Sequence, residues 1–350
     1  SYGLTFPSKP ALFTEEWWDL FGWFMEEAKK RNMTVSLSDY TLGVGQGSYV
    51  DDALNENPGL TGAELKFESD TIQDKYAKTC HDQLLSLYAY QLGTDGKIIE
   101  NSGIDLSGNL TGNKIEWQSP AEGNWIVTQV YSVAKKPSLD PMHPLSGKSY
   151  VKHFFQRFED RFPEQSKGGL NFFFSDELNF NLHGYIWNSI FRDEFRKRKG
   201  YDIVPYLTAL FTHIGPITPK IRLDYNDVMG SLSEENFFIP VYQWHEDRNL
   251  IYGCDHGGRG KDVSEFGDYF RTQRWNQAPG CDQPNLGKDI IKNKVASSIA
   301  HLYKRPRVWL EGFHSSNWDT NTANLTDATF ANFVMGQNLL SLHGFYYSTM

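Results

Sequence analysis

Hydrophobic and polar positions along this chain form blocks that predict helices and strands in turn. Between residues 15 and 31, Trp18, Phe21 and Met25 recur at helical spacing, with charged side chains on the opposite face. The nearly continuous apolar run Gly169–Ser175 is typical of a strand buried on both faces. The same reasoning predicts helices at 15–31, 150–162, most of 183–249, 288–303 and 327–340, and strands at 2–6, 33–39, 124–133, 169–175, 250–254, 274–278, 307–310 and 341–347.

The order of these elements predicts the fold class. Strands that alternate with helices or long crossovers favour an α/β fold with a parallel sheet, and about eight such units favour a (β/α)8 TIM-type barrel. Residues 80–124 differ, because short alternating runs and the turn pairs Asp95-Gly96 and Ser107-Gly108 predict a small β-rich insertion. We expect one barrel domain over residues 1–350 with this insertion inside it. The chain begins at Ser1 without an initiator Met, so we interpret it as cut from a longer protein.

Composition narrows the choice of partner. The 350 residues include 34 basic and 43 acidic side chains, which gives a net charge of −9. Nucleic acids and anionic membranes are bound by basic surfaces, so we expect neither as a partner. No apolar run reaches the ~18 residues that a transmembrane helix requires. Aromatic residues make up 15% of the chain, which predicts either a large aromatic core or flat faces on which sugar rings stack.

Polar residues gather where the predicted apolar strands end. In a (β/α)8 barrel the carboxyl ends of all strands open on one face, and that face holds the active site. We therefore expect residues far apart in the sequence to converge there. The strand ends concerned carry Asp39 and Tyr40, Asp176 and Glu177, Asp255 and His256, and Glu311 with His314 close behind, and the last strand carries His343.

Glu177 and Glu311 form the sharpest pair among these residues. Cleavage of a glycosidic bond requires one carboxylic acid that protonates the leaving oxygen and one carboxylate that acts as base or nucleophile. A neighbouring carboxylate and an apolar wall both raise a carboxyl pKa, and Asp176 with the run Phe172–Phe174 could supply both to Glu177. The alternative is that each Glu is a salt-bridge partner at the end of a strand.

The remaining candidates have weaker patterns. Asp282, in Pro279–Asp282, could orient water, hold a sugar hydroxyl or bind a hard cation, or be an ordinary loop residue. Each histidine could bind hydroxyl groups or be structural. A barrel that binds sugar without cleaving it stays open, as does a metal-dependent hydrolase built on Asp255, His256, His314 and His343. The substrate-binding candidates are Asp39, Tyr40, Asp176, Asp255, His256, His314, Trp318 and His343.

Several stretches resemble one known family, the α-L-rhamnosidases of glycoside hydrolase family 106. The most specific are Phe172-Phe-Phe-Ser-Asp-Glu177 and Gly200-Tyr-Asp-Ile-Val-Pro-Tyr-Leu-Thr-Ala-Leu-Phe211. Lys294-Val-Ala-Ser-Ser-Ile-Ala-His-Leu-Tyr303, the segment 26–39 and the closing segment 342–348 agree with them. The resemblance covers most of the chain.

This resemblance implies a (β/α)8 catalytic domain, an inverting mechanism and a calcium ion near the bound sugar. It implies Glu177 as the general acid, Glu311 as the base that activates water, and Asp282 as a further acidic residue, near which calcium would bind. We therefore expect an inverting exo-α-L-rhamnosidase that acts on a plant or microbial polysaccharide and is periplasmic or secreted. Carboxyl groups only ~5 Å apart would instead indicate a retaining enzyme of a related barrel clan, such as a β-galactosidase.

Overall fold

The chain divides into two compact units. The computed structural model describes residues 9–38, 49–164, 170–256 and 260–343. The first unit consists of the described residues of Ser1–Leu60, Pro141–Phe180 and Leu232–Met350, and the second consists of Thr61–Asp140 and Asn181–Ser231. The second unit is thus inserted into the first in two pieces of sequence.

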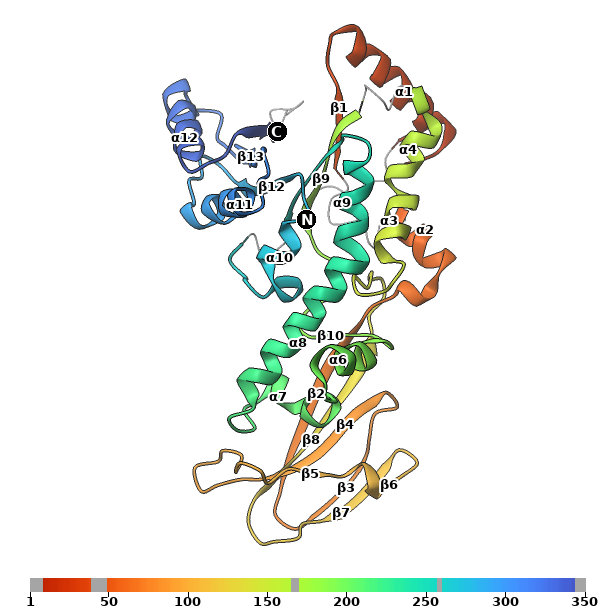
Figure 1. Cartoon of the computed structure of the whole chain (residues 1–350), viewed down its shortest axis with the longest axis vertical. Helices are drawn as coiled ribbons and strands as arrows, with labels where there is room; N and C mark the ends of the chain where they lie inside the picture. The colour runs from red at the N-terminus through yellow and green to blue at the C-terminus, as the bar shows by residue number, and fades with distance from the viewer. Residues whose placement is uncertain (1–8, 39–48, 165–169, 257–259, 344–350) are drawn as a thin grey trace. The chain divides into compact units, whose positions relative to one another are not determined.

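A six-stranded parallel sheet forms the centre of the first unit (Figure 1). Each strand of this sheet pairs with the next one along the chain, an order typical of barrels and different from that of doubly wound sheets, in which the order reverses. The carboxyl ends of all six strands therefore lie at one edge. In sheet order the strands are β1 Val35–Ser38, β9 Leu170–Leu178, β11 Ile251–His256, β12 Ala278–Gln283, β13 Trp309–Gly312 and β14 Leu339–Leu342.

The predicted α/β class is confirmed. The predicted closed barrel of eight strands is not shown by the described residues, which form a sheet of six parallel strands. In the part of the chain that the structure describes, β1 and β14 are the two edges of this sheet. The predicted strand 2–6 lies outside the described residues. The predicted strand 124–133 exists as β8 Trp125–Ala134, but it pairs antiparallel with other strands in the second unit.

Helices flank the parallel sheet, and some of them begin at a polar residue that caps them. Thr14 accepts a hydrogen bond from the Trp17 amide at the start of the first helix, and Asp289 does the same for the amides of Ile291 and Lys292. Helix α11 packs beside β12 (Figure 1). The helices are α1 Glu15–Lys30, α2 Tyr49–Glu56, η2 Pro58–Leu60, α3 Ser146–His153, α4 Phe155–Arg161, the π-helix η5 Glu234–Phe238, α9 Ile239–Glu246, η6 Glu265–Gly267, α10 Tyr269–Gln273, α11 Ile290–Leu302 and α12 Thr322–Val334.

Two helix predictions need correction. The single helix expected at 150–162 is two helices, α3 and α4, because the backbone of Phe154 leaves helical geometry with φ −118° and ψ −81°. The last helix was expected at 327–340 but begins at Thr322. There the Asn321 side chain accepts a hydrogen bond from the Asn324 amide.

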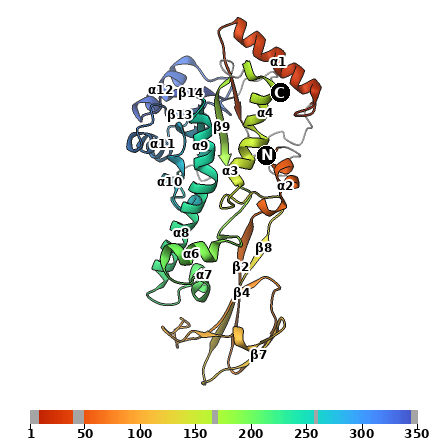
Figure 2. The same ribbon diagram turned by 45° about the vertical axis from the view of Figure 1, so that its right-hand side comes forward.

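The second unit is built on two antiparallel sheets. Figure 2 shows its long strands β2, β4 and β8 close together, and β2 pairs with β8 over ten residues from Ala63↔Ala134 to Ile72↔Trp125. One sheet has the order β10-β2-β8-β4-β5 and the other β3-β7-β6. The elements are β2 Ala63–Ile72, β3 Lys75–Thr79, β4 Leu84–Gln91, β5 Ile104–Asp105, η3 Ser107–Asn109, β6 Leu110–Thr111, β7 Lys114–Gln118, β8, β10 Ile186–Trp187, α6 Phe191–Lys199, η4 Val204–Tyr206, α7 Thr208–Phe211 and α8 Thr218–Ser233, whose last two residues belong to the first unit.

The core of the second unit lies among these strands. Leu87, Ala89, Ile115, Trp125 and Val127 are buried together there. The β-rich insertion predicted at 80–124 falls inside this unit, whose antiparallel strands begin earlier, at Ala63, and end later. Among the described residues, no helix has the length and apolar character needed to cross a membrane.

Candidate active site

Strand β9 ends in a bulge that carries two of the predicted acids. Ser175 pairs with Cys254 and Leu178 pairs with His256, so Asp176 and Glu177 together face the single residue Asp255 on β11. Glu177 has φ +49°, a left-handed conformation that non-glycine residues rarely adopt. Its amide donates a hydrogen bond of 2.9 Å to Asp255 Oδ1. Bulges and strained residues of this kind are frequent next to active sites, where they re-aim a side chain.

Asp255, at the end of β11, is a buried acid whose pKa is raised by its burial and by the other acids at the strand ends. Its side chain is fully buried, and burial is the main reason that its carboxyl pKa lies well above the ordinary value. The negative charges of Asp176, Glu311 and Asp282 raise this pKa further. The structure therefore brings the other three acids close enough to act on Asp255, although β9, β11, β12 and β13 contribute one acid each.

Asp282 and Glu311 lie side by side on neighbouring strands. They are register partners on β12 and β13, and each is almost completely buried. His314 Nε2 lies 2.7 Å from Asp282 Oδ1, and His343 Nε2 lies 3.7 Å from Glu311 Oε1. The two imidazole rings meet edge to face, with their centroids 5.0 Å apart. Four candidate residues thus form two adjacent carboxylate–imidazole pairs.

Lys292 is a residue of this region that the sequence reasoning missed. It lies on α11, is almost completely buried, and donates a hydrogen bond of 2.9 Å from Nζ to the Asp282 carbonyl oxygen. The signal was present, because Lys292 interrupts the apolar side of a predicted helix. A buried lysine bonded to the backbone of Asp282 adds a positive charge next to one of these acids.

The other sequence candidates lie in different surroundings. His256 is fully buried, its Nε2 lies 2.9 Å from Thr272 Oγ1, and burial lowers its imidazole pKa to about 3. It is therefore a neutral group enclosed by protein. Trp318 is 72% exposed in the segment after β13. Asp39 and Tyr40 lie outside the described residues.

Asp282 was the residue expected near calcium, so its surroundings test that expectation. Calcium takes about six to eight oxygen ligands. The Asp282 carboxyl is already bonded to His314, and its carbonyl oxygen faces the Lys292 ammonium. Within the described ranges, no group of three or more His, Cys, Asp or Glu is arranged to hold a metal ion. The described donors alone do not fit a calcium site, so calcium stays a prediction and no step proposed below uses it.

Carboxyl groups gathered at the carboxyl ends of parallel strands define a class of proteins, the α/β enzymes that work at that edge of the sheet. The sequence match is more specific. A model of glycoside hydrolase family 106, described as alpha-L-rhamnosidase, matches residues 48–348. This chain belongs to that family.

A solved structure supports the fold. The rhamnosidase from Novosphingobium sp. PP1Y superimposes with a TM-score of 0.54 at 20% sequence identity, over 70% of this chain. The match covers 26% of that protein, so this chain spans about a quarter of its length. A search of curated proteins gave no match. At this identity the likeness concerns the fold alone.

Proposed function

We propose that this chain is the catalytic region of an inverting exo-α-L-rhamnosidase that removes terminal rhamnose from a plant or microbial polysaccharide. Family membership supports the substrate class. The observation that carries the proposal is the position of Asp255. Its carboxyl group accepts a hydrogen bond from the Glu177 backbone amide, and, besides burial, the charge of Glu311 raises its pKa. This common neighbour supports a shared site for the two glutamates.

In the proposed mechanism Glu177 protonates the leaving glycosidic oxygen. Glu311 takes a proton from a water molecule on the opposite face of the sugar ring, and that water attacks the anomeric carbon. Inversion requires room for this water, so the two carboxyl groups should lie ~6.5–9.5 Å apart when substrate is bound. A bulge with a left-handed residue is the kind of feature that re-aims a side chain, which supports different roles for Asp176 and Glu177.

The neighbouring residues would prepare the two glutamates for these roles. His343, half exposed beside Glu311, could bind a sugar hydroxyl or accept the proton that the base has taken. Asp282 bonds to His314 and, through its backbone, to Lys292, and it lies next to Glu311. Its negative charge would favour transfer of the water proton to Glu311. Asp176, Trp318, Asp39 and Tyr40 stay proposed contacts for the sugar. A polysaccharide substrate also predicts a periplasmic or secreted enzyme.

The product anomer tests activity, sugar and stereochemistry in one experiment. Proton NMR during hydrolysis of an aryl α-L-rhamnoside should show β-L-rhamnose as the first product, before mutarotation. An α-anomer as the first product would instead indicate a retaining mechanism. If the protein binds rhamnose-containing polysaccharides but hydrolyses neither them nor the aryl rhamnoside, it is a sugar-binding protein and not an enzyme.

A further inference from the structure

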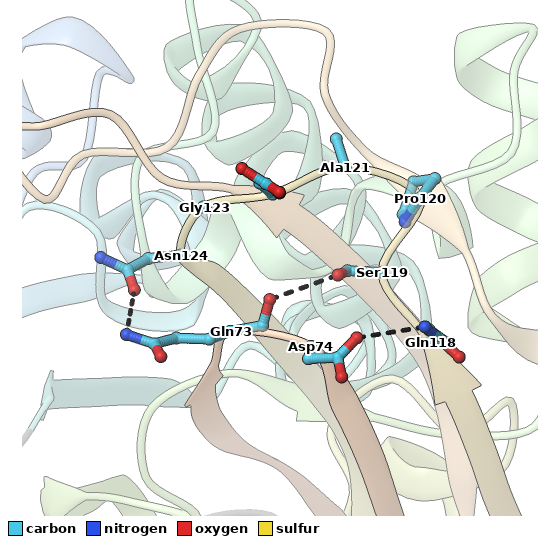
Figure 3. Close-up of a pocket in the computed structure, with 9 residues that line it drawn as sticks. Gln73, Asp74, Gln118, Ser119, Pro120, Ala121, Gly123 and Asn124 are labelled. Atoms are coloured by element: carbon cyan, nitrogen blue, oxygen red, sulfur yellow. Dashed lines mark hydrogen bonds between the residues drawn. The ribbon is translucent and has the colours of Figure 1, made fainter.

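The second unit contains a hollow that the proposed mechanism does not use. It has a volume of about 730 Å³, within the range of small-molecule binding sites. Two segments line it, Gln73–Asp74 between β2 and β3, and Gln118–Asn124 at the connection from β7 to β8 (Figure 3). All of these residues belong to the second unit.

The topology of the two sheets explains why the hollow forms there. β2 and β8 pair in one sheet, and β3 and β7 pair in the other. Both lining segments therefore cross from one sheet to the other at the same end, since Ile72 pairs with Trp125 and Lys75 pairs with Gln118. The strand pairs separate at this point, and the crossing segments surround the space between them.

Hydrogen bonds hold the two lining segments in place. Asp74 Oδ1 accepts from Gln118 Nε2 at 3.2 Å, and the Asp74 carbonyl oxygen accepts from the Ser119 amide at 2.8 Å. Gln73 Nε2 donates to Asn124 Oδ1 at 3.4 Å (Figure 3). Behind the rim, the buried Trp125 donates from Nε1 to the carbonyl oxygen of Ala121 at 3.1 Å. The hollow is thus pre-formed, which lowers the entropic cost of binding a ligand.

The side chains of the hollow suit a ligand rich in hydroxyl groups. Glutamine, asparagine and serine offer donors and acceptors together, which is what a hydroxyl group requires because it both donates and accepts. The carboxylates of Asp74 and Glu122 add strong acceptors, and no lining residue is basic. This charge disfavours a uronate or other anionic sugar. Pro120, Ala121 and Gly123 supply short apolar surfaces between the polar groups.

We propose that this hollow is an accessory site for a neutral oligosaccharide segment of the polysaccharide whose ends the enzyme hydrolyses. The inference rests on the proposed function for the identity of the polymer. The site would hold the polymer on the enzyme between successive cleavages. It would have no part in the chemistry, so small substrates would not depend on it.

Two substitutions in the hollow and one outside it test this site. Asp74→Ala and Glu122→Ala each remove an acceptor, and Asp95→Ala removes an exposed carboxylate from a turn elsewhere in the same unit. Calorimetry with a neutral rhamno-oligosaccharide, in the Glu311→Gln background, should show at least about tenfold weaker binding for the first two and no change for the third. In the otherwise wild-type enzyme the first two should raise KM for the polysaccharide and leave aryl α-L-rhamnoside hydrolysis unchanged.

Charge reversal gives a sharper test. Glu122→Lys should weaken binding of the neutral oligosaccharide and strengthen binding of an oligogalacturonate, which is anionic. Equal affinity of the wild-type hollow for both sugars, or equal binding by all the variants, would overturn the accessory site while leaving the hydrolase intact. The two proposals can fail separately. If the substitutions in the hollow weaken oligosaccharide binding but the wild-type protein does not hydrolyse the aryl rhamnoside, the accessory site is supported and the proposed hydrolase activity is wrong.

Discussion

Two carboxyl groups, Asp255 in the first unit and Glu68 in the second, lie in opposite surroundings. Asp255, in the parallel sheet, is fully buried, and both burial and the charges of three acids raise its pKa. Glu68, on β2 of the second unit, is partly exposed and is bonded to His81, Lys78 and Tyr131. The hydrogen bond with His81 and then that with Lys78 lower its pKa to about 2.

A difference of this kind is expected between a structural carboxylate and one that takes part in a reaction. A protein that needs only a stable fold surrounds a carboxylate with donors, as around Glu68. Gathering buried acids costs stability, and such clusters are retained where the perturbed pKa values serve a reaction. The comparison therefore favours the strand ends of the first unit as the place of the chemistry. It also yields predictions for each unit that differ in sign or size.

The largest expected effect is the loss of activity in Glu177→Gln and Glu311→Gln. Glutamine keeps the shape of each side chain but can neither donate nor accept the transferred proton, so turnover of an aryl α-L-rhamnoside should fall by at least about 10²-fold. The loss in Glu177→Gln should be smaller on an aryl rhamnoside with an electron-withdrawing ring, whose leaving oxygen needs less protonation than that of an unsubstituted phenyl rhamnoside. The same exchange in the other unit, Glu68→Gln, serves as the control and should retain activity. Full activity in either active-site variant would remove that residue from the mechanism.

The second effect concerns stability and compares two glycines. A Cβ on Gly280 of β12 would lie 2.0 Å from Nε1 of the fully buried Trp309, its register partner on β13. Because neither side can move, Gly280→Ala should destabilise the protein by about 3 kcal/mol or more. A Cβ on Gly108 of the second unit meets nothing within 4 Å, so Gly108→Ala should change stability by less than about 0.5 kcal/mol. Urea unfolding measures both, and equal midpoints would show that β12 and β13 can separate.

Gly280 also shows why one strand was misplaced in the sequence prediction. The weak strand expected at 274–278 is β12 at Ala278–Gln283, because Pro279 and Gly280 hide a strand that packs against Trp309. The apolar runs at 169–175, 250–254 and 307–310 coincide with β9, β11 and β13 within a few residues. Strands made of consecutive large apolar residues can be recognised from local composition. The strand β12 cannot, because its Gly280 leaves room for the Trp309 ring of the neighbouring strand.

Contacts between distant segments account for the rest of what the sequence could not predict. The acids at the strand ends were visible, but the bulge at Glu177 depends on Asp255, 78 positions away. The sequence predicts a single domain with a β-rich insertion at residues 80–124, whereas the second unit also includes residues before and after that insertion. Its strand β2 carries Glu64, Lys66, Glu68 and Asp70, and pairs with β8 from about sixty residues further along the chain. The charged residues at alternate positions of β2 are a local strand signal that the sequence reasoning missed, but its pairing with β8 over this separation cannot be read from either segment alone.

The third prediction uses the buried acid of the comparison. Since the folded protein holds the Asp255 proton more tightly than the unfolded chain does, the contribution of Asp255 to stability should fall as pH rises above the ordinary carboxyl pKa of about 4. Asp255→Asn keeps an acceptor for the Glu177 amide but has no proton to lose. Its stability relative to wild type should therefore increase with pH, as measured by urea unfolding between about pH 4 and pH 8. A pH-independent difference would mean that Asp255 is not held in its protonated form.

The smallest effect is expected at Glu68, with the opposite sign. Its folded pKa of about 2 lies below the unfolded value of 4.5, so its stabilising contribution is complete above the unfolded value and is lost as pH falls toward 2. Because the side chain is more than a third exposed, solvent screening limits this contribution to at most about 1 kcal/mol. Glu68→Gln should thus be slightly less stable than wild type at pH 7 and equal to it near pH 2, in the same unfolding experiment. A loss that persists at low pH would assign the role of Glu68 to packing, and the contrast with Asp255 would then no longer be one of charge.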